Sequence, residues 1–410
     1  MEKLKDKTKI RIAVVIPRYY PVFGGAENQC RLLNRYLLAS RKVCIPFIVT
    51  KLIERKSNRE EFIDGIFVKR LGFHGSNRWS EYYFYLSAFF TLLINRNKFD
   101  VVHCHATSIV GFMMTVVGRI LKKPVILKLS TNGELLRMTG NTKKRGRFPL
   151  NVISQGHKLL AAFTVKHAHV IALNQEGRDE LVLSCARRLH LIPNGVDISL
   201  WKPLSAAERV QLRSRYQFGS NDFVFVYTGR FVKRKGINTL IDGYRKFSKR
   251  LGSRAESVHL FLVGDDTVQQ DYSTKQFLGT FDCMTLKNVQ VFNNSNNVSE
   301  YLQLSDAFVF ASYNEGLPNS VLEAIAAGLP CVLSDIRPHL ELMNQHQNQG
   351  HYLFKAGSST SLADALMRCH SRLVLDGTSR SESTVYLDEQ YAINAVAQRY
   401  IQLYETVINI

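Results

Sequence analysis

Two glutamates stand out because they lie beside or inside a run of apolar residues. From Val321 to Ala327, Glu323 is the one polar residue, and Glu315 lies just before this run. The pattern predicts a buried helix that begins at Pro318 and ends before Gly328. A buried acid usually has a partner, so both glutamates are candidates for binding or catalysis. A pair at this spacing also arises by chance, and a plain strand–helix–strand unit stays the alternative.

A basic turn follows another predicted strand, in the second half of the chain. It reads G-R-F-V-K-R-K-G from Gly229 to Gly236, with Arg230 and Lys235 near its two ends. Ligands of open α/β sheets bind beside the carboxyl ends of strands, and Arg and Lys both bind phosphate oxygens. Arg230 and Lys235 are therefore candidates for holding a diphosphate leaving group. Lys233 and Arg234 are expected to be solvated, and the whole turn could also be ordinary surface charge.

The first half of the chain begins with a similar layout. A β-rich run, Ile10–Pro17, leads to a turn with Gly24 and Gly25 and then to a predicted helix, Ala26–Leu38. Glycines at such a turn let the backbone approach a ligand, and a helix start attracts negative charge. Gly25 is the candidate contact, although tight packing also explains a Gly-Gly pair. The spacing matches neither G-x-G-x-x-G nor a Walker loop, which counts against a dinucleotide or ATP enzyme.

Two histidines end the predicted strand Phe99–His105. His103 and His105 are two residues apart, so their side chains point to the same side of the strand. A metal site would need further ligands at suitable positions, and the sequence offers none, so no metal is expected. Either His105 lines a binding site at the carboxyl end of the strand, or the two histidines form a hydrogen-bonded structural pair.

Several motifs together resemble those of a known family. In chain order they are P-x-x-G-G-x-E at residues 21–27, I-P-N-G-V-D at 192–197, G-R-x4-K-G at 229–236 and E-G-L-P-N at 315–319. They resemble the retaining glycosyltransferases of family 4, which have the GT-B fold. The resemblance implies an α/β fold in which two Rossmann-like domains face each other across a cleft that closes around the donor.

The resemblance also implies a division of the chain into domains. Its 410 residues suit two domains of about 200 residues each. Residues 1–200 would form the acceptor-binding domain and residues 201–385 the nucleotide-sugar-binding domain. The remaining residues, 386–410, would form a C-terminal helix that crosses back to the first domain.

The same resemblance implies roles for single residues. Arg230, Lys235 and Glu315 would be catalytic, because the two cations stabilise the departing diphosphate while Glu315 contacts the donor sugar. Glu323 would accept hydrogen bonds from the ribose hydroxyls. The other expected donor-binding residues are Gly25, Gly316, Leu317, Pro318 and Asn319. The donor would be a UDP-sugar or GDP-mannose, and neither a cofactor nor a metal is expected.

One family position differs in this chain. Most of the family has a histidine after the strand Pro124–Leu129, where this chain has Ser130. That histidine is thought to meet the donor sugar and the acceptor. The acceptor-side candidates are therefore Ser130, Asn132, Glu134 and His105. The expected acceptor is a glycan, free or linked to a polyprenyl or other lipid, in the synthesis of lipopolysaccharide, O-antigen, capsule or exopolysaccharide.

Cysteine usage and hydropathy indicate a cytoplasmic protein. The seven cysteines include no C-x-x-C pair, which suits a reducing compartment and suggests neither disulfides nor zinc. The basic N-terminus lacks the apolar region of a signal peptide. Trp79–Ile94 is rich in aromatic residues but short, and it contains Glu81, so we expect an amphipathic helix and not a membrane span.

The net charge of +20 lies almost wholly in the first half of the chain. Residues 1–200 carry 33 Lys and Arg against 14 Asp and Glu, whereas the two kinds nearly balance in residues 201–410. Such asymmetry indicates an anionic partner. Basic residues near an anionic leaflet contribute ~1 kcal/mol each. We therefore expect peripheral contact with the inner face of the cytoplasmic membrane, with a solvated basic surface as the alternative.

Two other functions stay open from the sequence. A nucleotide-sugar epimerase would share the fold, because a fold does not determine its chemistry. A basic, non-catalytic binding protein would explain the charge. Nucleic acid is not the expected partner, because no recognised nucleic-acid motif accompanies the basic residues.

Overall fold

The computed structural model divides the chain into two compact units. Unit 1 comprises Met1–Gly195 and Ile393–Ile410, and unit 2 comprises Val196–Ala392. The chain thus passes between the units after residues 195 and 392, where the expected boundaries were 200 and 385. The residues that the structure describes are 9–21, 24–53, 57–74, 78–107, 109–129, 150–184, 186–219, 221–264, 288–293, 297–345, 350–374 and 387–409.

Unit 1 is built on a sheet with the strand order β3-β4-β2-β1-β5-β6-β7-β8. Neighbouring strands are parallel except β3 and β4, which form an antiparallel hairpin. The order reverses between β1 and β5, as in doubly wound Rossmann-type sheets. The strands are β1 (Ile10–Val15), β2 (Val43–Lys51), β3 (Glu60–Ile63), β4 (Ile66–Leu71), β5 (Val101–Cys104), β6 (Val125–Lys128), β7 (His169–Ala172) and β8 (Leu189–Leu191).

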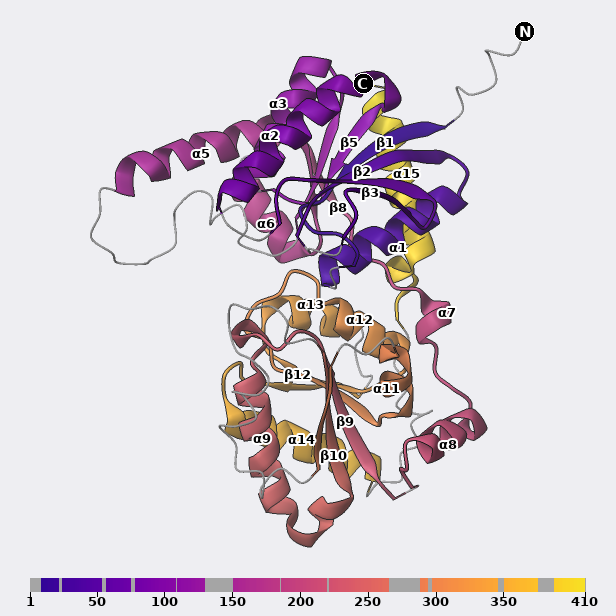
Figure 1. Ribbon diagram of the computed structural model, residues 1–410. Coiled ribbons are helices and arrows are strands. Elements are labelled where there is room, and N and C mark those ends of the chain that lie inside the picture. The colour runs from indigo at the N-terminus through magenta and orange to yellow at the C-terminus, as the bar shows by residue number, and fades with distance from the viewer. Residues whose placement is uncertain are drawn as a thin grey trace. The chain divides into compact units, whose positions relative to one another are not determined.

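Helices cover both faces of this sheet (Figure 1). Alternate residues of β1 point to opposite faces. Ile12 and Val14 join the side chains of α1 and α15 in one buried cluster, whereas Ala13 and Val15 join those of α2 and α3 in another. The helices are α1 (Gly25–Ala39), α2 (Arg78–Ile94), α3 (Ile109–Leu121), α5 (Leu150–His167), α6 (Gln175–Leu183) and α15 (Ile393–Ile408).

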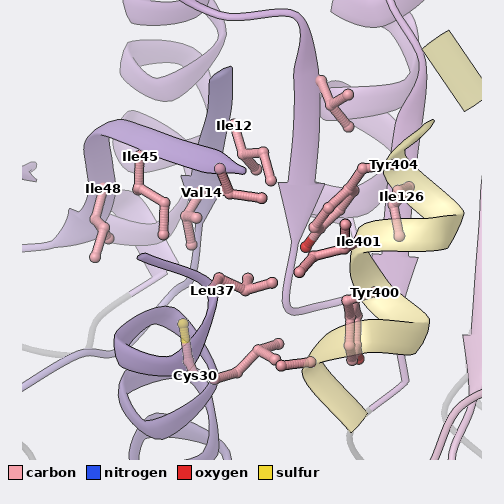
Figure 2. Close-up of a cluster of buried hydrophobic side chains, with 14 of the residues drawn as sticks. Ile12, Val14, Cys30, Leu37, Ile45, Ile48, Ile126, Tyr400, Ile401 and Tyr404 are labelled. Atoms are coloured by element: carbon pink, nitrogen blue, oxygen red, sulfur yellow. The ribbon is translucent and has the colours of Figure 1, made fainter. Parts of the chain in front are cut away.

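The C-terminal helix α15 is part of the core of unit 1. Figure 2 shows Tyr400, Ile401 and Tyr404 of α15 lying opposite Cys30 and Leu37 of α1, in one cluster with side chains of the sheet such as Ile12 and Val14. All these side chains are almost fully buried. The first unit therefore needs the end of the chain to cover this face of its sheet.

Unit 2 has an all-parallel sheet with the order β11-β10-β9-β12-β13-β14. Every residue of β9, β12 and β13 is buried, as expected for strands covered on both faces. The strands are β9 (Phe223–Thr228), β10 (Val258–Gly264), β11 (Val289–Asn293), β12 (Ala307–Phe310), β13 (Cys331–Ser334) and β14 (Tyr352–Phe354). The helices are α7 (Ile198–Trp201), α8 (Ala206–Arg215), α9 (Ile237–Leu251), α11 (Val298–Leu304), α12 (Asn319–Ala326), α13 (Arg337–Gln345) and α14 (Ser359–Val374).

Helix α2 differs from the amphipathic helix that its sequence suggested. It forms over the expected residues, but the side that faces solvent carries large apolar side chains, among them Trp79 and Ile94. The expectation of a polar outer face was wrong, because a helix that is apolar all round does not reveal which side the sheet covers. In the described part of the chain, no helix combines the length and the hydropathy needed to cross a membrane.

Candidate active site

The candidate residues of unit 2 gather where its strand order reverses. This reversal lies between the neighbouring strands β9 and β12, and ligands of doubly wound sheets bind outside the carboxyl ends of such strands. The segment after β9 contains Arg230 and Lys235 and leads into α9. The segment after β12 contains Glu315 and leads into α12 (Figure 1). Two motifs that are about 80 residues apart in sequence therefore meet at one edge of the sheet.

The two segments touch through their backbones. Gly236 has a φ of +68°, and a Cβ atom at this position would lie 1.9 Å from the carbonyl oxygen of Ala311. The amide of Tyr313 donates to the carbonyl of Arg234 at 3.0 Å, and Ser312 Oγ lies 3.1 Å from the same carbonyl oxygen. Only glycine permits both this conformation and this approach, which explains the second glycine of the basic turn.

Glu315 lies at the centre of the contacts between the two segments. Its Oε1 accepts hydrogen bonds from Lys235 Nζ at 2.7 Å and from Ser312 Oγ at 2.5 Å, and its Oε2 lies 3.3 Å from a guanidinium nitrogen of Arg234. Burial alone would raise the pKa of Glu315, but the charges of Lys235 and Arg234 and these hydrogen bonds outweigh burial and lower it. Glu315 is therefore an ionised carboxylate held by two cations.

Lys235 is half-buried beside Glu315, while Arg230 begins the same turn. Burial lowers the pKa of Lys235, and the carboxylate of Glu315 partly offsets this effect. The positive charges of Arg234 and Arg230 also act on Lys235, so the turn places three cations near one another. Lys233 is exposed, as expected, but the expectation that Arg234 is solvated was wrong because its guanidinium is half-buried against Glu315.

A chain of hydrogen bonds supports Glu315 from behind. The Ser334 hydroxyl donates to the carbonyl of Ser312 at 2.6 Å, and His339 Nδ1 lies 2.8 Å from the carbonyl of Ser334. Nδ1 must carry a proton to bond this carbonyl. Burial lowers the pKa of His339 to about 4, so the ring is neutral. Sequence reasoning did not identify Ser334 or His339, and their polar side chains after a buried strand were the available signal.

Glu323 differs from Glu315 because no described cation is paired with its carboxylate. It lies in the second turn of α12 and is half-buried, and burial raises its pKa to about 7. Within the described part of the chain, its carboxylate has neither a hydrogen-bond partner nor an ion-pair partner. A desolvated carboxyl group without a partner is costly, which makes Glu323 a candidate for binding a ligand with hydroxyl donors.

The residues between the two glutamates form the start of α12. Gly316, Leu317 and Pro318 are buried, and Asn319 is half-buried. Pro318 is the N-cap residue and not the first helical residue, so the helix begins one residue later than expected. The helix ends as expected, because Gly328 follows it with a φ of +74°.

The candidates of unit 1 lie at the equivalent reversal, between β1 and β5. Gly25 is the exposed first residue of α1, after β1, and His105 directly follows β5. His103 shares a 2.8 Å hydrogen bond with the hydroxyl of Tyr404, and the rings of His103 and His105 are 4.3 Å apart. The structure thus gives His103 a structural contact with α15. Ser130, Asn132 and Glu134 lie outside the described residues.

Lys128 was not identified from the sequence. This residue ends β6 and is 6% exposed, and its Nζ lies 5.6 Å from the ring centroid of Tyr400. Burial lowers the pKa of Lys128 to about 8. Burial lowers the pKa of the neighbouring His103 to about 3, and the charge of Lys128 is the second, smaller cause of this shift. A lysine at the end of an apolar strand was an available signal, because lysines are rarely buried.

A metal centre is not evident in the residues that the structure describes. Among them, no group of three or more His, Cys, Asp or Glu side chains is placed to hold an ion. The Asp265–Asp266 pair, whose spacing differs from D-x-D, lies outside the described residues.

Two family models match the chain. The model described as Glycosyltransferase Family 4 matches residues 23–200, and the model described as Glycosyl transferases group 1 matches residues 208–371. Together they account for most of both units. The chain belongs to the family 4 glycosyltransferases.

Named relatives and a solved structure agree with this assignment. This glycosyltransferase is 25% identical over 295 residues to UDP-Gal:alpha-D-GlcNAc-diphosphoundecaprenol alpha-1,3-galactosyltransferase of Escherichia coli, over 70% of this chain and 71% of the relative. It is 21% identical over 404 residues to GDP-mannose:cellobiosyl-diphosphopolyprenol alpha-mannosyltransferase of Xanthomonas campestris, over 97% of each chain.

The solved structure of sucrose-phosphate synthase from Thermosynechococcus elongatus matches with a TM-score of 0.74 at 17% identity. The match covers 98% of this chain and 100% of that one. This likeness shows the fold, which is GT-B, as expected from the motifs.

Proposed function

We propose that this glycosyltransferase transfers a hexosyl residue from a UDP-sugar or GDP-mannose to a lipid-linked glycan, with retention at the anomeric carbon and without a metal ion. The observation that carries the proposal is the pair of unlike glutamates at the strand reversal of unit 2. Glu315 is held by Lys235 and Arg234, whereas Glu323 is desolvated and has no ion-pair partner among the residues that the structure describes. A nucleoside diphosphate sugar offers both anionic oxygens for the cations and hydroxyls for the free carboxylate.

The cations of the basic turn are proposed to stabilise the leaving group. Negative charge grows on the diphosphate as the bond to the sugar breaks, and fixed cations in a site of low dielectric stabilise that charge most. Lys235 uses one N–H on Glu315 and has two more to donate. Arg230 offers a planar fork of donors. The start of α12, at Leu317 to Asn319, adds the positive end of a helix dipole.

The two glutamates are proposed to bind different parts of the donor. Glu323 accepts hydrogen bonds from the two ribose hydroxyls, which supply the partners that its carboxylate does not find among the described residues. Glu315 contacts the hydroxyls of the transferred sugar while the ion pair with Lys235 fixes its orientation. In this arrangement Glu315 also couples the position of the sugar to that of the cation that faces the diphosphate.

The acceptor is proposed from the relatives and from charge. The names of the two relatives specify acceptors on diphosphoundecaprenol and diphosphopolyprenol. An acceptor of this kind carries a diphosphate and a lipid, which suits the basic first half of this chain. We place the reaction at the cytoplasmic face of the membrane, in the synthesis of a cell-surface polysaccharide. His105 in unit 1 stays the described acceptor-side candidate, and Gly25 the contact for the donor diphosphate.

Nucleotide binding provides the first test. Thermal unfolding is measured with UDP, GDP, UDP-sugars and GDP-mannose, because a ligand that binds only the native state raises the melting temperature. One nucleotide family should raise it in the wild type, with or without EDTA, and should lose this effect in Glu323→Ala. The matched control is Glu256→Ala, at an exposed glutamate of unit 2. If none of these ligands shifts the wild type, the proposed donor site is wrong.

The chemistry is tested by product analysis. The donor identified by the thermal shifts is incubated with synthetic polyprenyl diphosphate glycans, and NMR reads the anomeric configuration of the product. An α-linked product from an α-linked donor supports retention, and an inverted product contradicts it. Release of an epimerised sugar from the donor in the absence of any acceptor would instead identify an epimerase.

A further inference from the structure

Helix α2 presents large apolar side chains to solvent along its whole length. Its buried side, at Phe84, Ala88 and Leu92, already packs on the sheet of unit 1. The apolar side chains on its outer side are between 47% and 82% exposed: Trp79, Tyr82, Tyr83, Leu86, Phe90 and Ile94. A surface helix ordinarily has polar residues on this side. A continuous exposed apolar row of this size marks a surface that binds a protein, a membrane or a ligand.

The row follows the axis of the helix. Trp79, Tyr83, Leu86, Phe90 and Ile94 recur every three or four residues, so they share one side of α2 from its first turn to its last. Among the α2 side chains that the structure describes, Glu81 is the one charged residue. A straight apolar row on a convex helix fits a flat apolar layer better than a pocket.

The aromatic residues are concentrated at one end of the row. Trp79, Tyr82 and Tyr83 lie in the first turns of α2, and the exposed Phe73 contacts Tyr83 in a tilted arrangement with ring centroids 4.6 Å apart. Tryptophan and tyrosine favour the boundary between lipid headgroups and acyl chains. Leu86 and then Phe90 and Ile94 continue the row without any hydroxyl group.

Basic residues lie at the other end of the row. The ammonium group of Lys123, after α3, donates to the backbone carbonyl of Arg96, after α2, so the two helices end side by side. Around these ends are further exposed bases: Arg96, Lys98, Arg119 and Lys122. The nearby acid, Asp100, is already paired with Arg11 at 2.6 Å. This basic cluster is therefore complementary to an anionic surface.

We infer that α2 is a membrane-docking helix that lies in the plane of an anionic bilayer. Its outer row enters the boundary of the acyl chains while the basic cluster binds acidic headgroups. This inference deepens the proposed use of a lipid-linked acceptor and rests on it for its role. It differs from attraction by charge alone, because apolar insertion persists when salt screens the charges.

The test uses the full chain and vesicles of stated composition. Vesicles of phosphatidylcholine with phosphatidylglycerol, and of phosphatidylcholine alone, are sedimented with the protein at 0.1 and 0.5 M salt. Trp79 and Trp201 are the two tryptophans of the chain, so the variant Trp201→Phe makes Trp79 the sole fluorophore. Its emission should shift to the blue on binding and be quenched by brominated lipid, which a purely electrostatic contact would not cause.

Paired variants separate insertion from charge. Leu86→Gln with Phe90→Gln should weaken vesicle binding roughly tenfold or more at both salt concentrations, because two half-exposed apolar side chains are removed. Val210→Gln is the control, because Val210 is also apolar and is 68% exposed on α8 of unit 2. Lys98→Glu with Lys122→Glu should weaken binding to anionic vesicles mainly at low salt.

Three results would overturn the inference. One is an unchanged Trp79 emission in the presence of vesicles, and another is undiminished binding by the Leu86→Gln and Phe90→Gln variant. The third is a dimer, seen by light scattering, that this variant dissociates while vesicle binding is absent, since α2 would then join two copies of the chain. Nucleotide-induced thermal shifts are recorded for every variant, so failure of the donor site and failure of membrane docking are distinguished.

Discussion

Replacing Glu323 with glutamine should stabilise the unliganded protein at pH 8 but not at pH 5. In the folded protein burial raises the pKa of Glu323 from 4.5 to about 7. A carboxyl group with a raised pKa contributes stability below its unfolded pKa and loses it as the pH rises through its folded pKa. The two values correspond to at most ~3 kcal/mol above pH 7. Because the side chain is only half-buried, we expect ~1–2 kcal/mol after solvent screening.

The assay compares thermal unfolding of the wild type, Glu323→Gln and the exposed control Glu256→Gln at both pH values. For a unit of about 200 residues, 1 kcal/mol moves the melting temperature by roughly 2–4 °C. Glu323→Gln should therefore melt several degrees above the wild type at pH 8 and together with it at pH 5. An equal gain at both pH values would refute the reasoning, because the benefit would then not come from removing a charge.

Nucleotide binding should show the opposite effect of the same substitution. If ribose hydroxyls donate to Glu323, the ionised carboxylate binds them best, so binding by the wild type should strengthen as the pH rises from 6 to 8. Calorimetry in buffers of different ionisation enthalpy should detect proton release below pH 7. Glu323→Gln should bind more weakly, without this pH dependence. Binding that is independent of pH in the wild type would separate Glu323 from the donor.

Three further substitutions test other features. Lys128→Met should raise the free energy of unfolding near pH 7 by up to ~3 kcal/mol. The lowered pKa of Lys128 makes the wild type lose stability as the pH drops from 10.5 to about 8. Urea unfolding should therefore show the difference in stability between variant and wild type closing as the pH rises towards 10.5. Gly236→Ala should cost more than ~2 kcal/mol in the same assay, since its Cβ would meet Ala311 in a left-handed conformation. Lys235→Met should lower kcat by roughly 100-fold, and an unchanged kcat would contradict the proposed role. It should also raise the pKa of Glu315, because the charge that lowers this pKa is removed. The stability that the variant loses relative to the wild type should therefore be smaller at low pH than at pH 7.

Patterns in the sequence predicted the elements that bring the candidate residues together. Apolar runs ended at polar or glycine-containing turns, and parallel strands place such turns at one edge of a sheet. This reasoning was sufficient to expect Lys235 and Glu315 at the same edge. It did not show that they form an ion pair, because the distance between two side chains depends on how closely the loops approach. That approach depends on Gly236 and the backbone of Ala311.

Other features depended on local geometry that the sequence pattern did not reveal. Lys233–Lys235 form a single 3₁₀ turn, in which successive side chains point in three directions, so Arg234 and Lys235 both reach Glu315 while Lys233 faces solvent. For α2, a sequence that is apolar all round was compatible with any orientation on the sheet. Ser334 and His339 act behind Glu315 through backbone carbonyls, which no residue spacing predicts.

The discontinuous first unit has a consequence for the synthesis of the protein. A ribosome must complete all of Val196–Ala392 before it makes α15, and at about 5–20 residues per second this takes roughly 10–40 s. At the end of that time, unit 2 has its entire sequence and can fold. The sheet face that α15 covers stays exposed, and contacts such as Tyr404 with His103, 301 residues apart, form last. The half of the enzyme that is made first is therefore the half that finishes folding second, and a nascent chain stalled near its end would present this uncovered face to chaperones.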